Sequence, residues 1–470
     1  MTVTATAVVT PGETRPLRRI WWVPIVPALV ALAMGAWQIT IPSMWRDESV
    51  TAVVARMPLP DMWRLLGDMD AVHGLYYFLM RPLAASGWPV EWALRLPSLV
   101  AFAATAYGVA ALGGRLAGPW AGLCGGLIYA LLPIASRYGQ EARSYALVSA
   151  VTVLATWLLL AAVERPGFVR FAAYALSVAL LGWLHVYALL MLIPHAFAGW
   201  RRPIRWLLAL AVAAALLAPL ALTAAGQRDT QLYWLKVPTP DELAAFPLQV
   251  AGSWQAVGVI GVATLAGLWR TRRIPVVAAW AVLPVLISYG VSQVYPMYHP
   301  RYVLFAVPGM AVLAGAGLVW LGRLLPPRWA PPALGVVLVG VLTAGTQVAI
   351  RQPDSRADDL RALANTLRTD ELPGDGVLYV PDQYRLFVGA YPEPYDRLTD
   401  LTRASGVYWP RSGQELLAAA TGLTRVWVVS PSTVFRYRDD PRLLALRTQF
   451  KKGEVSTFGS IHLVLYTRKR

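Results

Sequence analysis

Long runs of apolar residues fill the first 350 positions of the chain, and short polar loops separate them. A helix needs about 20 apolar residues to cross the hydrocarbon core of a bilayer, so the pattern predicts an all-α membrane domain. One stretch, 170–200, is either one long helix or two short spans that meet around 183–187. The other runs of spanning length lie near 20–42, 92–113, 118–136, 144–163, 203–224, 250–269, 275–294, 302–322 and 331–350.

Positive charge in the loops decides between the two readings of 170–200. Cytoplasmic loops of membrane proteins carry an excess of Lys and Arg. With two short spans in this stretch every basic loop falls on one side, whereas with one span the later basic loops fall outside. The sequence therefore predicts about eleven transmembrane helices, with the N-terminus in the cytoplasm and the C-terminus outside. The basic loops are 15–19, Arg115, 164–170, 201–205, 270–273 and 323–328.

The external face receives the longer polar segments. The first external loop, about 43–91, contains Ser49–Met57 and Leu75–Ala85, whose amphipathic patterns predict helices lying along the interface. No internal repeat of the kind that builds many transporters is found. The remaining external segments are Arg137–Arg143, the turn at His185, 225–249, Tyr295–Arg301 and everything after about 351.

The last 120 residues change character and become richer in charge, Pro and Gly. Short strands alternating with helices predict a small α/β domain with its own core. We therefore expect a cytoplasmic tail (1–19), a transmembrane domain (20–350) and an external α/β domain (351–470). Its predicted helices are Arg356–Thr369, Gln383–Ala390, Gly413–Ala420 and Asp440–Phe450, and its predicted strands are Gly376–Val380, Thr424–Ser430 and Ser460–Thr467.

Composition supports a membrane protein, because 57% of the residues are hydrophobic and only 14% are charged. The net charge of +16 would suggest nucleic acid as a partner, but many of the basic residues lie in short loops between apolar spans. We expect a lipid bilayer and no nucleic acid. The first span is long and runs into an acidic pair, which argues against a cleaved signal peptide. The single cysteine, Cys124, excludes a disulfide within the chain.

Candidate chemistry begins at Trp45-Arg46-Asp47-Glu48, directly after the first apolar run. Two carboxylates so close to hydrocarbon are expensive to hold, so by default they mark a functional site. The alternative is a pair of solvated charges at headgroup depth. Further polar residues at other span ends on the same predicted side favour a site: His73, the run 137–143, His185 and Arg301.

The order of these motifs resembles the GT-C superfamily of polytopic glycosyltransferases, specifically the protein O-mannosyltransferase and aminoarabinose-transferase branch (glycosyltransferase family 39-like). The resemblance covers roughly residues 20–325, and each motif is weak by itself. Relatives commonly have Pro-Pro where this chain has Gly74 and the residue after it. The matching motifs are the acidic pair, Asp70–Tyr77, Leu94-Arg95-Leu96-Pro97-Ser98, Tyr138–Tyr145 and Arg301-Tyr302.

The resemblance implies roles that agree with the chemistry of glycosyl transfer from a lipid phosphate. Such a transfer needs a base for the acceptor hydroxyl and cations for the leaving phosphate. Asp47 is the expected base, and Glu48 either orients the site or has a structural role at the loop. The expected phosphate ligands are Arg301, Arg143, Arg137 and Tyr302. The expected sugar- or acceptor-binding residues are His73, Asp70, Gln140, Glu141, His185 and Tyr145.

Each of these polar residues also has a plainer reading. The arginines could be interfacial residues whose side chains extend to the lipid headgroups. Gln140 and Glu141 could stabilise their own turn, and the histidines could be ordinary interfacial groups. His195, deeper in its span, is expected to pack. No cofactor is expected. A divalent metal is conceivable from Asp47, Glu48, Asp70 and His73, but no spacing requires one.

The sequence thus predicts an inverting glycosyltransferase on the external face of a bacterial plasma membrane. The donor would be a polyprenyl-phosphate sugar, with mannose expected, and the acceptor a lipid, glycan or protein hydroxyl. The Arg-heavy, Ala-rich usage suggests a high-GC, actinobacteria-like source. Arabinose or another pentose is the alternative sugar. A lipid-linked sugar flippase would instead place charges near mid-membrane and show repeated, broken helices, and a structural partner with a degenerate site fits poorly with Asp47 and Arg301.

Overall fold

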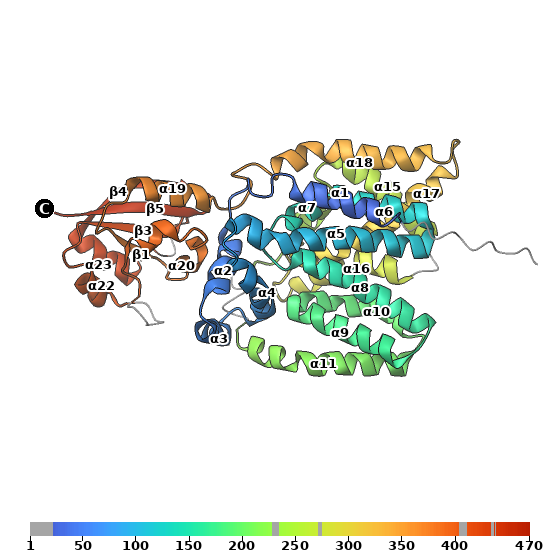
Figure 1. Ribbon diagram of the computed structural model, residues 1–470, viewed down its shortest axis with the longest axis horizontal. Helices are drawn as coiled ribbons and strands as arrows, with labels where there is room; N and C mark the ends of the chain where they lie inside the picture. The colour runs from blue at the N-terminus through green and yellow to red at the C-terminus, as the bar shows by residue number, and fades with distance from the viewer. Residues whose placement is uncertain (1–21, 228–234, 271–274, 404–410, 434–436, 438) are drawn as a thin grey trace, which may run out of the picture.

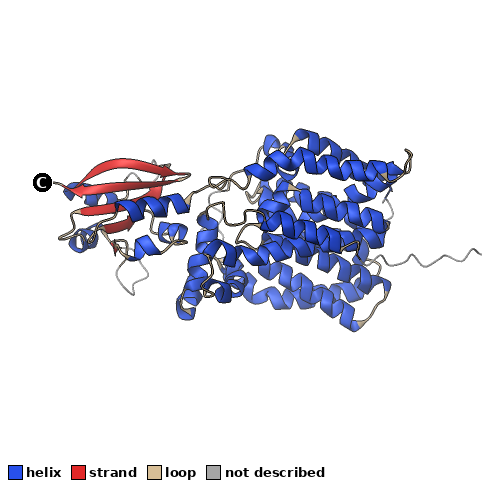
Figure 2. Ribbon diagram, turned by 45° about the horizontal axis from the view of Figure 1, so that its top comes forward, coloured by secondary structure: helices blue, strands red, loops and turns tan. Residues whose placement is uncertain are grey.

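The computed structural model describes residues 22–227, 235–270, 275–403, 411–433, 437 and 439–470. The predicted tail 1–19 and most of the basic loop 270–273 lie outside the described residues. A helical bundle occupies one end of the molecule, and a smaller unit with a sheet occupies the other (Figure 1). Between them lie three helices of the first loop, α2 (Arg46–Arg56), α3 (Leu59–Asp68) and α4 (Gly74–Ala84) (Figure 1). Figure 2 shows the strands in the smaller unit.

The bundle contains the apolar helices that the hydrophobic runs predict. By length and composition, six helices of the described chain could cross a membrane, two bent pairs could each form one more span, and three apolar helices are shorter. The count of about eleven spans therefore stays a prediction. The six are α5 (Val90–Ala117), α8 (Tyr145–Glu164), α11 (Pro203–Ala225), α16 (Pro275–Ser292), η3 with α17 (Pro300–Ala306 and Val307–Gly322) and α18 (Ala330–Ala349).

Breaks in the other helices fall at prolines, at glycines and at the polar turns. The pair α6 (Pro119–Leu131) and α7 (Pro133–Gly139) is bent by 66° at Pro133, which has no N–H to continue the helix. The bend of 91° before α15 (Trp254–Arg270) follows Gly252, which has a positive φ of 78°. The short helices of this second pair are α13 (Pro240–Ala244) and α14 (Phe246–Ala251).

The ambiguous stretch 170–200 forms two short helical segments that meet at His185, as the distribution of basic loops predicts. The first is α9 (Phe168–Leu184), and the second is η2 (Val186–Met191) continued by α10 (Leu192–Gly199). The predicted first-loop helices correspond to α2 and α4, and α3 between them was not predicted. Whether α2 and α4 lie at a membrane interface stays a prediction.

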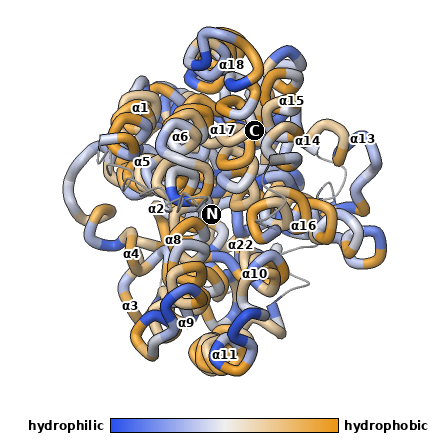
Figure 3. The backbone as a smooth tube through the Cα atoms, turned by 90° about the vertical axis from the view of Figure 1, so that its right-hand side faces the viewer, coloured by the Kyte–Doolittle hydropathy of each residue, from blue (hydrophilic) through white to orange (hydrophobic). Residues whose placement is uncertain are grey.

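The outer helices of the bundle present apolar side chains outward, as helices in contact with lipid do. Figure 3 colours much of α11 and α16 as hydrophobic. On α11, Leu208 and Leu222 are 62% and 80% exposed, and on α18 Val341 is 65% exposed. In contrast, α17 is almost entirely buried and packs against α6 and α15 through Gly315 and Gly317, where any side chain would meet backbone atoms. This packing fixes η3, which carries Arg301.

The C-terminal unit is a mixed five-stranded sheet in the order β2-β1-β3-β5-β4. β1 runs parallel to β2 and β3, β3 pairs antiparallel with β5, and β4 and β5 form a hairpin. The strands are β1 (Gly376–Tyr379), β2 (Thr399–Asp400), β3 (Arg425–Pro431), β4 (Phe450–Phe458) and β5 (Ile461–Arg468). The helices are α19 (Leu360–Asp370), α20 (Tyr384–Val388), α21 (Glu393–Asp396), α22 (Gly413–Ala419) and α23 (Pro441–Gln449).

Alternate residues of the strands build two separate cores on the two faces of the sheet. Leu378 and Val428 pack with α22 and α23 on one face. Val377 and Val429 belong to a core that includes α19 and α20 on the other face. That second core continues into α2 and α4 through Val54 and other residues. The C-terminal unit therefore shares a hydrophobic core with the first-loop helices.

Candidate functional site

Three consecutive residues at the start of α2 point to three different parts of the molecule. Arg46 binds the segment that leads to the C-terminal sheet, Asp47 binds Arg301 at the start of η3, and Glu48 binds Arg95 of α5. Trp45 precedes the helix with an extended backbone. The acidic residues therefore occupy the first helical turn, where the positive end of the helix dipole favours carboxylates.

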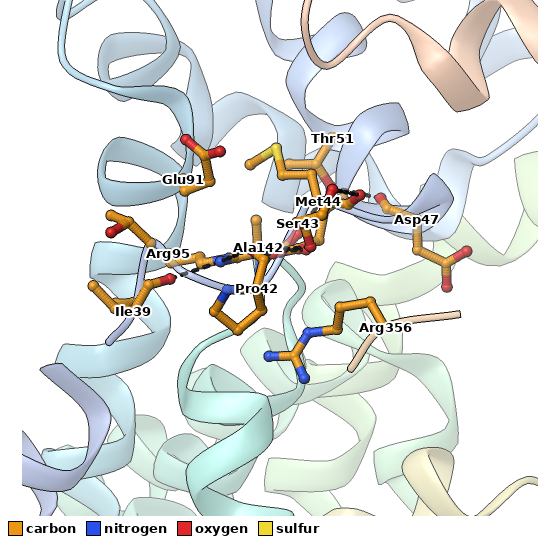
Figure 4. Close-up of polar contacts among 12 residues, drawn as sticks. Ile39, Pro42, Ser43, Met44, Asp47, Thr51, Glu91, Arg95, Ala142 and Arg356 are labelled. Carbon is orange, nitrogen blue, oxygen red and sulfur yellow. Dashed lines mark hydrogen bonds and ion pairs between the residues drawn. The ribbon is translucent and has the colours of Figure 1, made fainter. Parts of the chain in front are cut away.

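Glu48 is fully buried and makes a two-pronged ion pair with Arg95, which is labelled in Figure 4. Arg95 Nε lies 2.8 Å from Oε1 and Nη2 lies 2.7 Å from Oε2, and the backbone N–H of Ala142 also donates to Oε1 at 2.8 Å. The remaining donors of Arg95 bind the carbonyl groups of Ile39, Pro42 and Ser43. These contacts support a structural role for Glu48, one of the two alternatives expected from the sequence.

Asp47 is the acidic residue that stays accessible. Its side chain is 20% exposed, and Oδ2 lies 3.2 Å from Arg301 Nη1, whose side chain is 12% exposed. The Arg301 guanidinium also lies 5.4 Å from the ring centroids of Trp45 and Tyr302. Both members of the pair can therefore reach a substrate, and Arg301 is oriented by aromatic faces as well as by charge.

A second cation, Arg143, lies beside this pair and is 7% exposed. Its Nη2 is 2.8 Å from His73 Nε2, so His73 accepts this hydrogen bond through the unprotonated nitrogen. Burial and the nearby Arg143 hold the pKa of His73 well below its usual range, which keeps the ring neutral. Asp70 accepts a hydrogen bond from the Tyr77 hydroxyl and has a positive φ of 65°.

The predicted aromatic site residues form one cluster on the bundle side of Arg301. Tyr302 lies 6.4 Å from Tyr145 and 5.4 Å from His185, and Tyr145 lies 5.6 Å from His185, measured between ring centroids. Tyr138 contacts Tyr145 at 5.2 Å and Tyr187 contacts Tyr302 at 6.0 Å. The cluster offers flat faces next to the Asp47–Arg301 pair.

Gln140, Glu141 and Arg137 come from the same turn and behave differently. Gln140 is fully buried, and its amide donates to the carbonyl groups of Gly35 and Trp37, so the bracing alternative explains its contacts. Glu141 is also fully buried, but neither carboxylate oxygen has a hydrogen-bond partner among the described residues. Arg137 is half-buried and lies against the Tyr138 ring.

Sequence reasoning missed three charged residues that structure places at the site. Arg95 lies inside a motif that it did not assign to a role, and a buried position for a charge is not visible in a single sequence. Arg356 and Asp358 come from the segment after α18, more than 300 positions from Asp47.

His195, expected to pack, is fully buried and contacts Thr156 and Tyr174.

The donor set does not favour a metal. Among the described residues, no group of three His, Cys, Asp or Glu side chains is placed to hold an ion. Of the four residues that could have formed a metal site, Glu48 is engaged by Arg95 and Asp47 by Arg301.

Comparisons with known proteins find structural likeness without close sequence likeness. No protein-family model matches the chain, and no curated protein matches it. ArnT from Cupriavidus metallidurans in the apo state has a TM-score of 0.61 at 13% identity, covering 95% of this chain and 98% of that one. The same protein bound to undecaprenyl phosphate has a TM-score of 0.58 at 14% identity and the same coverage.

An oligosaccharyltransferase from Archaeoglobus fulgidus, in complex with Zn and sulfate, has a TM-score of 0.56 at 12% identity. The match covers 95% of this chain and 73% of that one. All three matches cover 95% of this chain. The chain therefore shares its fold with ArnT and with this archaeal oligosaccharyltransferase.

Proposed function

We propose that this protein is an integral membrane glycosyltransferase that moves a sugar from a polyprenyl-phosphate donor to an acceptor hydroxyl on the external face of the membrane. The observation that carries the proposal is the partly exposed Asp47–Arg301 pair, with Arg143 beside it, inside a GT-C fold. A base and two cations are the groups that this transfer requires. The structure of ArnT with undecaprenyl phosphate supports a lipid-phosphate donor for a protein of this fold.

In the proposed reaction Asp47 takes the proton of the acceptor hydroxyl as its oxygen attacks the anomeric carbon. The bond from that carbon to the phosphate oxygen breaks, and polyprenyl phosphate leaves with the electron pair. Arg301 and Arg143 neutralise the charge that grows on the phosphate, since a guanidinium can bind two phosphate oxygens at once. Attack from the face opposite the leaving group inverts the anomeric configuration and needs no covalent sugar intermediate.

The remaining site residues receive binding or supporting roles in this proposal. Tyr302 lies beside the phosphate, and Tyr145, His185 and His73 line the sugar or acceptor. Asp70 holds Tyr77 at the edge of the site. Gln140 braces the turn that carries Glu141. Mannose is the proposed sugar, with arabinose or another pentose as the alternative, and the acceptor is a lipid, glycan or protein hydroxyl.

Polar residues gathered at helix ends favour this function over a flippase, which needs charged groups near mid-membrane. We also propose that the C-terminal unit lies outside a bacterial plasma membrane, on the same side as Asp47. An external site cannot be supplied by cytoplasmic nucleotide sugars, so a sugar already carried across on a lipid phosphate is the suitable donor.

The test uses purified protein in nanodiscs, offered polyprenyl-phosphate mannose and GDP-mannose in separate reactions. We expect transfer from the lipid donor only. Asp47→Asn should lower the rate by roughly 10²- to 10⁴-fold, the usual contribution of a general base. The matched control is Asp61→Asn, an exposed acidic residue of α3, which should leave the rate unchanged.

Arg301 separates phosphate binding from the other possibilities. Arg301→Ala should weaken donor use severely, and Arg301→Lys should restore only part of it because the fork of donors is lost. Transfer from GDP-mannose, or an unchanged rate in Arg301→Ala with the lipid donor, would contradict the proposal. Near-normal turnover in Asp47→Asn would move the role of base to another residue.

A further inference from the structure

The segment between α18 and α19 is fixed against the site at both of its ends. At the first end Arg351 is fully buried, and each nitrogen of its guanidinium has a partner. Nε donates to the Trp37 carbonyl at 3.0 Å, Nη1 to the carbonyl and side chain of Gln347, and Nη2 to Ser136 Oγ at 2.7 Å. Its guanidinium also stacks over the Trp37 ring at 4.4 Å.

At the second end Asp358 is fully buried and binds the residue before Asp47. Its Oδ2 accepts hydrogen bonds from Arg46 Nε at 2.9 Å and from the Arg46 backbone N–H at 3.3 Å. Its Oδ1 accepts from the backbone N–H and hydroxyl of Ser460, in the turn between β4 and β5. The segment is therefore held rigidly between the bundle and the sheet.

Between these two anchors lies Arg356, whose contacts are incomplete. The residue is only 6% exposed, and its Nη1 donates to the Ile350 carbonyl at 3.3 Å. Nε and Nη2 are buried and have no partner among the described residues. Figure 4 draws Arg356 in the same region as Asp47 and Ala142. It lies within electrostatic range of Arg137, Glu141 and Glu48.

Two charged neighbours of Arg356, Arg137 and Glu141, also have side chains without hydrogen-bond partners among the described residues. The side chain of Arg137 has no hydrogen bond or ion pair within the described chain, and its guanidinium lies 6.0 Å from the centroid of the Tyr138 ring. Neither carboxylate oxygen of Glu141 has a hydrogen-bond partner among the described residues, and burial raises the pKa of this carboxyl group. A protonated Glu141 could donate a hydrogen bond to an acceptor oxygen. Burial, with Arg137 nearby, lowers the pKa of Arg356 to about 9, which still leaves the guanidinium charged at neutral pH.

Burying a charged group without partners is costly, so an unmatched buried arginine needs an explanation. Arg351, five residues earlier, shows what a structural arginine in this segment looks like, because each of its nitrogens is matched. Arg301 and Arg143 already have Asp47 and His73 as partners. Among the described residues near Asp47, Arg356 and Arg137 are therefore the cations whose side chains have neither a carboxylate nor a histidine as hydrogen-bond or ion-pair partner.

We propose that Arg356, together with Arg137, binds an oxyanion of the substrates, a phosphate or carboxylate group, at a subsite separate from the Asp47–Arg301 pair. The proposal rests on the proposed function. The oxyanion belongs either to the lipid-phosphate donor or to an acidic acceptor. In both cases the segment that leads to the C-terminal sheet completes the catalytic site, which gives that unit a direct part in the reaction.

The first test compares two arginines of the same segment in the full-length protein. Arg356→Met should leave the unfolding temperature unchanged or raise it, because an unmatched buried charge is removed. Arg351→Met should lower it, because the hydrogen bonds of Arg351 to four residues, Trp37, Gln347, Ser136 and Met34, are lost. A fall in unfolding temperature for Arg356→Met as large as that for Arg351→Met would overturn the proposal, since Arg356 would then be a structural residue.

The second test measures binding in nanodiscs with two probes. Sugar-free polyprenyl phosphate reports on the donor, and glycerol phosphate, added with saturating polyprenyl phosphate, reports on an acceptor anion. Arg356→Met should weaken one of the two roughly 10- to 100-fold, the usual effect of losing a charged hydrogen bond, and Arg356→Lys should weaken it less. The exposed Arg368, on α19, provides the control variant Arg368→Met.

The probe that changes identifies the source of the oxyanion. Weaker polyprenyl-phosphate binding assigns Arg356 to the donor, and loss of glycerol-phosphate binding alone assigns it to an acidic acceptor. Unchanged binding of both probes in Arg356→Met overturns the inference. If wild-type protein binds no polyprenyl phosphate, the proposed function fails instead, and glycerol phosphate without the lipid still tests the Arg356 subsite.

Discussion

Arg95 holds Glu48 in a two-pronged ion pair in which both side chains are completely buried. The pair joins α2 to α5, and the Ala142 N–H that also binds Glu48 adds the turn before α8. The neighbouring side chain, Asp47, is thereby attached to a rigid support while its own carboxylate stays accessible. Positioning of this kind is what a general base requires, because small displacements reduce the rate strongly.

Removing either partner of the Glu48–Arg95 pair should destabilise the protein. A buried charge left without its partner costs about 3–5 kcal/mol, so Glu48→Gln and Arg95→Met should both lower the unfolding temperature in detergent. The double variant Glu48→Gln/Arg95→Met should recover part of the loss, because no unpaired charge remains. If Glu48→Gln unfolds at the wild-type temperature but is inactive, Glu48 has a catalytic role instead of a structural one.

His73 should make the protein sensitive to mild acid. Burial and Arg143 lower the pKa of His73 in the folded state, so below its ordinary pKa of about 6.5 the unfolded chain binds a proton that the folded site resists. Stability from this group is present above that pH and is lost as the pH falls toward the folded-state pKa. Unfolding temperatures measured from pH 8 to pH 5 should fall less steeply in His73→Gln. Equal slopes in the two proteins would contradict this assignment.

The helices of the bundle and the site residues at span ends could be predicted from the sequence, because both leave local patterns. Apolar runs marked the bundle helices, and the basic loops correctly placed the break at His185. The sequence analysis grouped five candidate residues because each lies at a span end on the same predicted side. The structure places these five close together: Asp47, Arg143, Tyr145, His185 and Arg301. β4 was missed because its Lys451–Glu454 stretch is exposed and charged, as is typical of an edge strand.

The contacts of the second half of the site could not be predicted from one sequence. Arg356 and Asp358 reach Asp47 and its neighbours only because the sheet unit folds back onto α2, and that packing depends on a core shared by residues more than 300 positions apart. The role of Arg95 could not be predicted for the same reason. In the sequence it is a charged residue near the start of a span, and only the structure shows that Glu48 is its partner. Long-range pairing of this kind leaves no local periodicity.

The predicted topology can be measured by thiol labelling in cells, in a Cys124→Ala background. Cysteines at Ser412 and Thr369, both exposed on the C-terminal unit, should react with an impermeant reagent once outer barriers are removed. A cysteine at Phe168, 88% exposed at the start of α9, should be protected, because the loop before it is expected in the cytoplasm. The reverse pattern would place Asp47 on the cytoplasmic side and remove the argument for a lipid-phosphate donor.

Asp358 should matter for turnover as well as for stability. Asp358→Asn weakens the hydrogen bonds to Arg46 and Ser460, and we expect a loss of about 1–3 kcal/mol in unfolding free energy. Because Arg46 directly precedes Asp47, the start of α2 should become less well positioned and kcat should fall even far below the unfolding temperature. Ser460→Ala should have the same effects to a smaller degree, since Arg46 keeps its partner.

The matched control for Asp358 is Asp375, another buried acidic residue of the C-terminal unit. Its Oδ2 accepts a hydrogen bond from Trp427 Nε1 at 2.8 Å, and its Oδ1 forms an ion pair with Arg425, both on β3 of the C-terminal unit. Asp375→Asn should therefore lower the unfolding temperature without lowering kcat at a temperature where the protein stays folded. A double-mutant cycle of Arg46→Ala and Asp358→Ala should show coupling in kcat as well as in stability. If Asp358→Asn and Asp375→Asn affect turnover equally, the contact with Arg46 serves folding alone, and the C-terminal unit does not position Asp47.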